Sequence, residues 1–269
     1  IRAIRQALSR RHGVEYVEAD PATEAAVTAV HDPGYVAAIR EFCADGGGSW
    51  DQDTVACEAT WDAALAAAGQ ARWAADRALA GDDGRRTPFA IGRPPGHHAV
   101  ADDAMGFCFF NNAAVAAAGA LDRSAVDRVA IVDWDVHHGN GIQELFEDRA
   151  DVLYVSVHER GLYPGTGDVE ETGTGPGAGA TCNVPLAAGA GDADYRHVVD
   201  ALVRPLLDRA DPDLVLVAAG LAAPPPDPIS RTRLPTEGHG PPAPPPRGAA
   251  AAGAARGGGR PPGRAAPAA

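Results

Sequence analysis

Three polar residues at regular spacing follow a short apolar run in the segment IVDWDVHHGNG, residues 131–141. The run itself, 129–132, is mostly β-branched and predicts a buried strand of an α/β sheet. Asp133, Asp135 and His137 then alternate with apolar residues, so the pleat of an extended strand places all three on one face. Open α/β sheets bind their ligands at the carboxyl ends of their strands, which makes this segment the leading candidate for a functional site.

Asp135 and His137 are of the types and spacing that hold a metal ion. They lie about 6.6 Å apart along an ideal strand, and a slight curl of the strand end lets both reach one ion. A carboxylate and an imidazole suit Zn²⁺, with Fe²⁺ or Mn²⁺ as weaker candidates. The alternative is a polar strand end whose side chains only form hydrogen bonds. A metal site requires at least one further ligand from elsewhere in the chain.

A second segment with chemical groups is RPPGHHAVADDAMGFCFFNN, residues 93–112. Its two prolines predict a rigid loop that presents His97 and His98, with Gly106 and Phe107 later in the same loop. One His pair in a loop is more often surface decoration than a site. A second His-His pair follows the strand described above, and this favours a functional reading of both.

The elements that position these residues follow from periodicity and turn signals. Helices are predicted over 1–12, 21–29, 31–42, 58–79, 111–121, 142–146 and 194–207, and strands over 14–18, 89–92, 129–137, 152–157 and 214–218. Strands that alternate with helices predict a three-layer α/β/α fold with a mostly parallel central sheet. A Gly-rich loop of more than twenty residues begins at Gly161, and its length favours a functional role. It is not a phosphate-binding loop, because no Gly-Lys-Ser/Thr follows.

Bulk composition narrows the classes of partner. The formal net charge of −13 argues against nucleic-acid or anionic-membrane binding. The four cysteines are scattered without a Cys-x-x-Cys pair, so neither a disulfide framework nor a thiolate zinc site is expected. No secretory signal or membrane-spanning run is seen, which makes the cytoplasm the expected location. The oligomeric state is left open. The chain begins at Ile1, already within a helical pattern, so further residues upstream are expected.

The last part of the chain differs in composition from the rest. Residues 241–269 use only Pro, Ala, Gly and Arg and carry +4, against −17 for 1–240 with 19 basic and 36 acidic residues. We therefore expect a domain over 1–240 and a disordered low-complexity tail over 241–269. One interpretation is a genuine basic tail. The other is translation of a damaged or out-of-frame GC-rich stretch, because codons of these four residue types can have G or C at both of their first two positions.

Five strings in fixed order resemble the zinc-dependent histone deacetylase family, and most closely its class II-like branch with the prokaryotic acetylpolyamine amidohydrolases. They are RPPGHHA, GFCFFNN, DWDVHHGNG, SVH and YPGTGD, within about residues 1–220. The resemblance implies the arginase-deacetylase fold. It also implies an amidohydrolase that removes acetyl or other acyl groups from lysine side chains, polyamines or small acyl-amines.

The resemblance also assigns roles to single residues. It implies that Asp135 and His137 are two of three metal ligands, and that His97 and His98 are the tandem catalytic histidines, oriented by Asp133 and Asn140. The remaining implied roles are a carbonyl at Gly106 for the substrate N–H, channel walls at Phe107 and Tyr163, and a K⁺ site formed by the backbone of Asp133, Asp135 and His137 with Ser156 and Val157. In the implied mechanism His98 is the general base on metal-activated water, and a tetrahedral intermediate collapses to acetate and amine.

Two parts of the family pattern are absent. The third ligand belongs to a Gly-aromatic-Asp-x-His string, but here Ala222 stands where the Asp is expected and Pro224 where the His is expected. A late Gly-Gly-Tyr string, which carries the oxyanion-stabilising Tyr, does not occur. A two-ligand site predicts weak metal binding, and loss of the Tyr predicts a rate lower by roughly 100-fold or more. If the sequence is damaged after Gly220, resequencing of the gene should restore an acidic residue at 222.

Three alternatives follow. The chain is an impaired or truncated deacetylase, or it is a non-catalytic relative that binds acylated amines. Zinc content together with turnover of an acetyl-lysine substrate separates these two. The third is a ureohydrolase, which shares the general architecture but binds two manganese ions through Asp-Ala-His-x-Asp strings. No such string is present.

Overall fold

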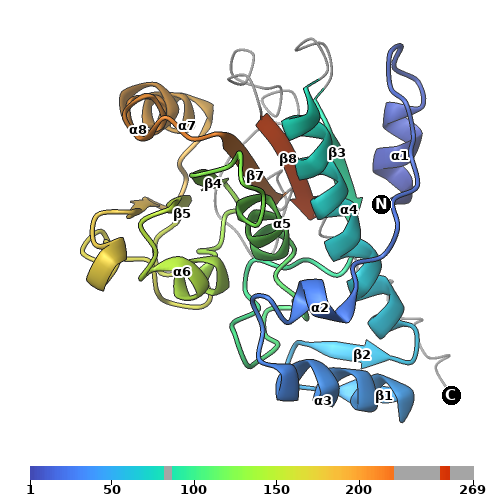
Figure 1. The fold of residues 1–269 in the computed structure, drawn as a ribbon. Helices are drawn as coiled ribbons and strands as arrows, with labels where there is room; N and C mark the ends of the chain where they lie inside the picture. Colours follow the sequence, from blue (N-terminus) through green and yellow to red (C-terminus); the bar gives the residue numbers. More distant parts are fainter. Residues whose placement is uncertain (82–86, 221–248, 255–269) are drawn as a thin grey trace, which may run out of the picture.

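The computed structural model describes residues 1–81, 87–220 and 249–254 of the chain (Figure 1). Its helices are α1 (Arg2–Leu8), α2 (Glu24–Val27), α3 (Pro33–Ala44), α4 (Thr60–Ala80), α5 (Asn112–Leu121), α6 (Asn140–Phe146), the 3₁₀ turn η1 (Gly175–Gly177), α7 (Asp192–Val198), the π-helical η2 (Val199–Val203) and α8 (Arg204–Ala210). Its strands are β1 (Gly47–Ser49), β2 (Val55–Cys57), β3 (Phe89–Gly92), β4 (Val129–Asp133), β5 (Val152–Glu159), β6 (Thr181–Leu186), β7 (Leu214–Gly220) and β8 (Ala249–Ala254).

The centre of the fold is a six-stranded sheet in the order β3-β8-β7-β4-β5-β6. All five of its strand pairs are parallel. β5, the next strand in the chain, pairs with one edge of β4, whereas β7 pairs with the other edge. This reversal creates a crevice at the carboxyl end of β4, where open parallel sheets bind their ligands.

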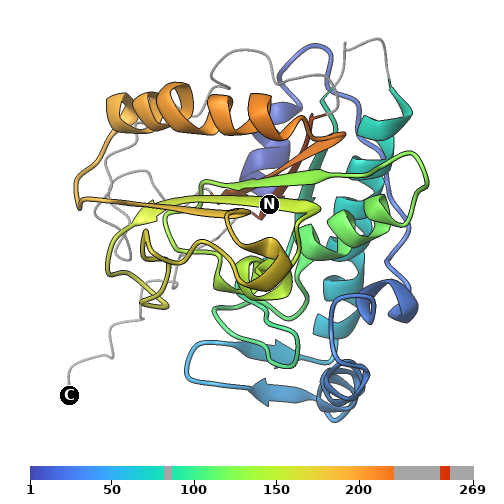
Figure 2. The ribbon, with the colours of Figure 1, turned by 60° about the vertical axis from the view of Figure 1, so that its left-hand side comes forward.

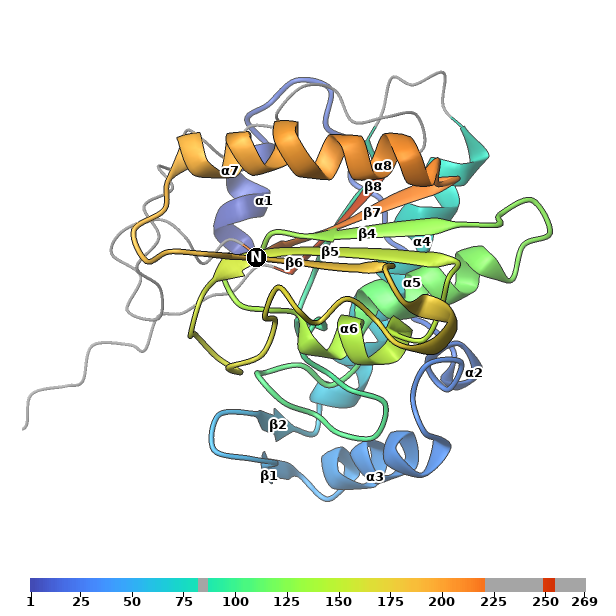
Figure 3. The same cartoon turned by 90° about the vertical axis from the view of Figure 1, so that its left-hand side faces the viewer.

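Helices cover both faces of the sheet, as the composition of the strands requires. Every residue of β4 is buried, and successive side chains point to opposite faces. Val129 and Ile131 pack in one apolar cluster with α4, α5 and α6, while Ala130 and Val132 pack in another with Val198 of α7. Figure 3 shows α7 and α8 over one face and α5 and α6 over the other. The predicted three-layer α/β/α fold is confirmed.

The loop that carries His97 and His98 is held at its far end by buried hydrogen bonds. His31 Nδ1 lies 2.8 Å from the Val100 carbonyl oxygen, and His31 Nε2 accepts from the Asn111 backbone N–H at 2.9 Å. Asn111 also caps α5, since its side chain accepts from the Ala114 N–H at 3.1 Å. Segments far apart in the sequence are therefore joined around this loop.

Several sequence predictions differ from the structure. The predicted strand over 14–18 is wrong: these residues form no regular element and most are exposed, because a strand needs a pairing partner. No element was predicted between the helices over 31–42 and 58–79, but β1 and β2 lie there and pair as an antiparallel hairpin beside α3 (Figure 2). The Gly-rich loop is interrupted by β6, which the prediction missed.

The expectation of disorder over 241–269 is not met at residues 249–254. They form β8, which lies between β3 and β7 and pairs with both. Small residues can enter a sheet in this way because a central strand gains backbone hydrogen bonds on both sides, independent of side-chain size. Residues 241–248 and 255–269 of the expected tail lie outside the described residues, as do Ala222 and Pro224. None of the described helices combines the length and hydropathy needed to cross a membrane.

Candidate active site

The chain curls directly after β4, and this curl brings Asp135 and His137 together. The strand ends at Asp133, so the expectation that the pleat alone aligns the three polar residues is wrong. Instead, Asp133 Oδ1 accepts from the Asp135 N–H at 3.0 Å, and Asp135 Oδ1 accepts from the His137 N–H at 2.8 Å. Asp side chains commonly make such turns two residues ahead of themselves.

Asp135 and His137 present two donor atoms of the kind that zinc prefers. Both residues are buried, and Asp135 Oδ1 lies 3.0 Å from His137 Nδ1. A carboxylate oxygen and an imidazole nitrogen so close together fit two ligand positions of one ion. Within 1–81, 87–220 and 249–254, however, no group of three or more His, Cys, Asp or Glu side chains could hold a metal. The described residues thus fit a zinc ion only in part.

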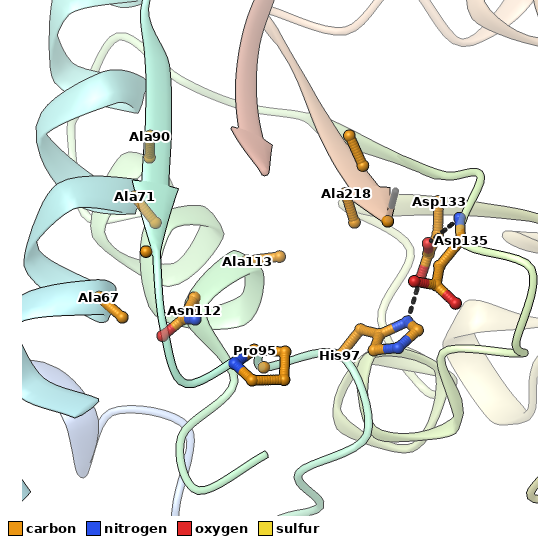
Figure 4. Close-up of a pocket in the computed structure, with 14 residues that line it drawn as sticks. Ala67, Ala71, Ala90, Pro95, His97, Asn112, Ala113, Asp133, Asp135 and Ala218 are labelled. Atoms are coloured by element: carbon orange, nitrogen blue, oxygen red, sulfur yellow. Dashed lines mark hydrogen bonds and ion pairs between the residues drawn. The ribbon is translucent and has the colours of Figure 1, made fainter. Parts of the chain in front are cut away.

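The tandem histidines are buried side by side, and each is oriented by one partner. His97 Nδ1 lies 2.9 Å from Asp133 Oδ2, and His98 Nδ1 lies 2.8 Å from Asn140 Oδ1. The two ring centroids are 4.0 Å apart. Figure 4 shows His97 directed at the carboxylate of Asp133. Because both acceptors are oxygens, both histidines carry a proton on Nδ1, and the Nε2 atom of each ring points away from that acceptor.

A glycine makes room for the His97–Asp133 pair. A Cβ atom at Gly139 would lie 2.3 Å from Asp133 Oδ2 and 3.1 Å from His97 Nδ1. The hydroxyl of buried Tyr154 fills the adjacent space and donates to the Gly139 carbonyl at 3.0 Å, with Asp133 Oδ2 at 3.4 Å. Burial raises the pKa of Tyr154 well above its ordinary value, so the hydroxyl remains a donor. Sequence reasoning did not identify Tyr154.

Gly106 and Tyr163 border the tandem histidines from the outer side. The Tyr163 ring meets His98 edge-on, with centroids 5.0 Å apart and an interplanar angle of 89°. A Cβ atom at Gly106 would lie 2.4 Å from His98 Cδ2 and 2.9 Å from Tyr163 Cε1. Phe107 has a φ of 67°, and both Phe107 and Tyr163 are 38% exposed. The structure therefore places Gly106 and Tyr163 against His98 and leaves both aromatic rings partly open to solvent.

A cavity lies beside His97 on the side of β3 and β7 (Figure 4). Small residues form most of its wall, and His97, Asp133 and Asp135 supply the polar part. Gly220, at the end of β7, packs directly on the Asp135 carboxylate: a Cβ atom there would lie 1.6 Å from Oδ2. Asp135, one of the two expected metal ligands, and His97 thus line one cavity at the carboxyl ends of β4 and β7.

A second pair of buried histidines, His138 and His158, lies behind the site. Their ring centroids are 4.9 Å apart. His158 Nε2 lies 3.0 Å from the Gly167 carbonyl oxygen, and His158 Nδ1 lies 2.9 Å from Ser156 Oγ. Burial lowers the pKa of both rings, that of His158 to about 4. Both are therefore neutral at pH 7. From the sequence, His138 was identified only as part of the second His-His pair and His158 only as part of the string SVH, and neither residue was given a role.

Two residues of the expected K⁺ site lie on the strand next to β4. Ser156 pairs with Asp133 in the β4–β5 register, and Val157 is the next residue of β5. Ser156 and Val157 are both buried. The strand register thus brings Ser156 beside the start of the curl.

Comparison with known proteins identifies the family of this chain. A family model described as "Histone deacetylase domain" matches residues 1–242. The chain belongs to the histone deacetylase family. Its relatives in this family include a histone deacetylase-like amidohydrolase from Pseudomonas aeruginosa, 41% identical over 217 residues, which cover 80% of this chain and 57% of that protein. Histone deacetylase 14, chloroplastic, from Arabidopsis thaliana is 37% identical over 224 residues, 80% of this chain and 53% of that protein.

Solved structures of histone deacetylase relatives have the same fold. The HDA15 HD domain superposes with a TM-score of 0.82 at 37% identity, over 88% of this chain and 67% of that one. Acetylpolyamine aminohydrolase from Burkholderia pseudomallei superposes with a TM-score of 0.76 at 33% identity, over 88% of this chain and 77% of that one. The chain spans little more than half the length of the two sequence relatives.

Proposed function

We propose that this histone deacetylase-family chain is a metal-dependent amidohydrolase that removes acyl groups from lysine side chains or acylated amines. The observation that carries the proposal is the pair of adjacent imidazoles, each with Nδ1 held by a separate acceptor, beside the convergent Asp135 and His137. Such a constellation provides proton transfer next to two metal-binding atoms, which amide hydrolysis by activated water requires.

His98 is the proposed general base. Asn140 Oδ1 accepts the Nδ1 hydrogen of His98, which leaves Nε2 with the lone pair that can take a proton from water. His97 is held by the Asp133 carboxylate, which stabilises positive charge on the imidazole. His97 is therefore suited to assist electrostatically or to donate a proton to the departing amine.

Asp135 and His137 would hold the divalent ion, for which zinc is the first candidate and Fe²⁺ or Mn²⁺ the weaker ones. When bound, such an ion polarises the amide carbonyl and lowers the pKa of its water. With two ligands among the described residues, we expect weaker binding than in a three-ligand site. A K⁺ ion bound by the backbone of Asp133, Asp135 and His137 with Ser156 and Val157 stays part of the proposal.

Gly106, Phe107 and Tyr163 are the proposed walls of the channel for the acyl-amine arm. Absence of a Cβ atom at Gly106 lets His98 and Tyr163 pack directly against its backbone. Acetylated lysine, acetylpolyamine and other small acyl-amines have arms of similar width, so these walls admit all three.

The test combines metal content with turnover. The full chain is expressed with zinc, its metal is quantified, and hydrolysis of a fluorogenic acetyl-lysine substrate is measured for the wild type, His98→Ala and His197→Ala. His197 is exposed on α7 and serves as the control. The proposal expects bound zinc and turnover that is abolished only by His98→Ala. Turnover that persists unchanged in His98→Ala would refute it.

The absence of Asp at 222 and of a Gly-Gly-Tyr string favours a second candidate, a non-catalytic protein that binds acylated amines. Under this alternative the chain holds no zinc and shows no turnover, but it binds an acetyl-lysine peptide. Binding measured by calorimetry, with the unacetylated peptide as control, separates the two candidates.

A further inference from the structure

Glu171, in the long Gly-rich loop, gathers hydrogen bonds from a tight turn of that loop. Its carboxylate accepts from the Gly167 N–H at 3.0 and 3.1 Å and from the Asp168 N–H at 3.0 Å. Partial burial raises the pKa of Glu171, but hydrogen bonds from the Gln143 amide and from these two N–H groups outweigh it and lower the pKa. The ionised carboxylate thus closes the turn 167–171 on itself.

Gln143 of α6 connects this turn to the body of the domain. Its Nε2 donates to Glu171 Oε2 at 2.6 Å. Its Oε1 accepts from Asn183 Nδ2 of β6 at 2.7 Å and lies 3.0 Å from His138 Nε2. Because Glu171 is an acceptor, the amide of Gln143 has only one orientation that satisfies all its contacts. The Gln143 side chain therefore fixes the turn to α6, and Asn183 Nδ2 of β6 also donates to the Glu171 backbone carbonyl at 3.2 Å.

The two buried histidines hold the other end of the same turn. His138 Nε2 donates to Gln143, so His138 Nδ1 accepts from the Thr166 hydroxyl at 2.8 Å. Gly167 packs on both rings: a Cβ atom there would lie 2.6 Å from His138 Cγ and 2.7 Å from His158 Cε1. From Glu171 to Thr166, the turn makes contact with fixed groups at each end and in the middle.

Only two residues, Pro164 and Gly165, separate this clamped turn from Tyr163. The Gly165 N–H donates to the Leu162 carbonyl at 2.8 Å, so the link itself forms a turn. Tyr163 is 38% exposed and meets His98 edge-on at 5.0 Å. Its ring contacts His98 but stays partly exposed, so the position of the ring also depends on the backbone that carries it.

We propose that Glu171 is a positioning residue for the acyl-amine channel, which through Gln143 and the turn 166–171 holds Tyr163 against His98. The inference rests on the proposed function and deepens it, because it names the residue that holds one wall of the acyl-amine channel in position. Loss of the Glu171 carboxylate is expected to release the turn from α6. Tyr163 then leaves His98, and the wall opposite Gly106 becomes mobile.

The test compares Glu171→Gln with Glu170→Gln, which removes the same charge from an exposed neighbour in the same loop. Glu171→Gln keeps the side-chain volume but turns an NH₂ group toward N–H donors. The first measurement is the ring-proton resonance of His98 in histidine-labelled protein, with Tyr163→Leu as the reference for loss of the Tyr163 ring current. We expect Glu171→Gln to move the resonance at least halfway to that reference, and Glu170→Gln to leave it in place.

The second measurement is amide hydrogen exchange at Gly167 and Asp168. Exchange in Glu171→Gln should be faster by about tenfold or more, because these two amides lose their acceptor. Thr166→Val, which removes a hydroxyl at an exposed position, provides a second variant should Glu171→Gln not fold, and it should shift the His98 resonance in the same direction. His98 resonances and amide exchange that are equal in the Glu171 and Glu170 variants would overturn the proposal.

Turnover, where the wild type shows it, supplies a third measurement. The KM for an acetyl-lysine peptide should rise by about fivefold or more in Glu171→Gln with a smaller change in kcat, because the channel wall and not the proton transfer is altered. A wild type without turnover would count against the proposed function alone, since the resonance and exchange measurements still decide the role of Glu171.

Discussion

His97 and His98 have the same tautomer, although their partners differ in charge. Asp133 and Asn140 each offer an oxygen to Nδ1, so both rings carry the proton there. His138 and His158 have the opposite tautomer, since their Nε2 atoms face the oxygens of Gln143 and Gly167. The acceptors thus sort these four histidines into two tautomers.

This sorting leads to a prediction that needs neither metal nor substrate. Long-range ¹H–¹⁵N spectra of histidine-labelled protein at pH 7 should show Nδ1–H for His98 and Nε2–H for His158. In Asn140→Leu, His98 loses the acceptor of its Nδ1 hydrogen, and its spectrum should change while that of His158 does not. An Nε2–H tautomer for His98 in the wild type would contradict the assignment of His98 as the general base.

Gly220 sets a steric limit on the proposed metal-ligand pair, Asp135 and His137. A Cβ atom there would overlap Asp135 Oδ2, so Gly220→Ala must displace the carboxylate from His137. We expect the affinity for Zn²⁺ to fall by about tenfold or more, in the range seen when ligand orientation is lost. Competition with a chromogenic chelator measures the affinity, and Asp135→Ala gives the reference for a lost ligand. An affinity within about twofold of the wild type would contradict the prediction.

At the scale of elements, the sequence predicts strands and helices where burial dominates. Continuous apolar runs predicted β3, β4, β5 and β7, and the Ala-rich repeat with Trp61 and Leu65 predicted α4. The β1–β2 hairpin and β6 were missed because their apolar residues follow neither the helical nor the strand period. β6 (TCNVPL) is fixed by its pairing with β5 instead. The tertiary partner decides such short strands.

The candidate site was likewise predicted only in part from the sequence. Residues with distinctive chemistry at fixed spacing, such as His97, His98 and Asp135, were predicted, and the structure brings them together. Glu171 and Gln143 were not predicted, because their role depends on a hydrogen bond between positions 28 apart that no local pattern encodes. The curl after Asp133 was anticipated only as a slight bend, and its cause is a pair of side chain-to-backbone hydrogen bonds.

β8 allows a test of an element by its backbone alone. Ala252 is paired with Ala90 on one side and with Ala218 on the other, so each N–H of this central strand has a neighbour. Ala252→Pro removes one N–H and should lower the free energy of unfolding by about 3 kcal/mol. Ala252→Ser is the matched control, and denaturant midpoints measure both. Equal midpoints for the two variants would show that β8 contributes nothing to the sheet.

At the scale of the whole molecule, His31 makes stability depend on pH. It is buried between the Val100 carbonyl, which accepts from Nδ1–H, and the Asn111 N–H, which donates to Nε2, so only the neutral ring satisfies both. Burial lowers the pKa of His31 from 6.5 to about 4. Between these values the unfolded chain binds a proton that the folded chain does not, and stability therefore falls as pH falls.

From pH 7 to pH 5, the His31 contribution should lower the free energy of unfolding by about 2 kcal/mol. His31→Gln keeps one donor and one acceptor without a titrating group, so its loss over the same interval should be smaller by that amount. His12→Gln, at an exposed histidine, should behave as the wild type. Denaturation by urea at the two pH values measures the free energy of unfolding of each variant. An equal change in this free energy for His31→Gln and the wild type would reject the explanation.

The place of β8 in the sheet also has a consequence for biosynthesis. β3 and β7 are both synthesised before residue 249, yet they meet only through β8. Until then two parallel edges stay unpaired, and such edges can recruit foreign strands. Nascent chains should therefore be vulnerable to aggregation until residues 249–254 have been synthesised and have paired with both strands.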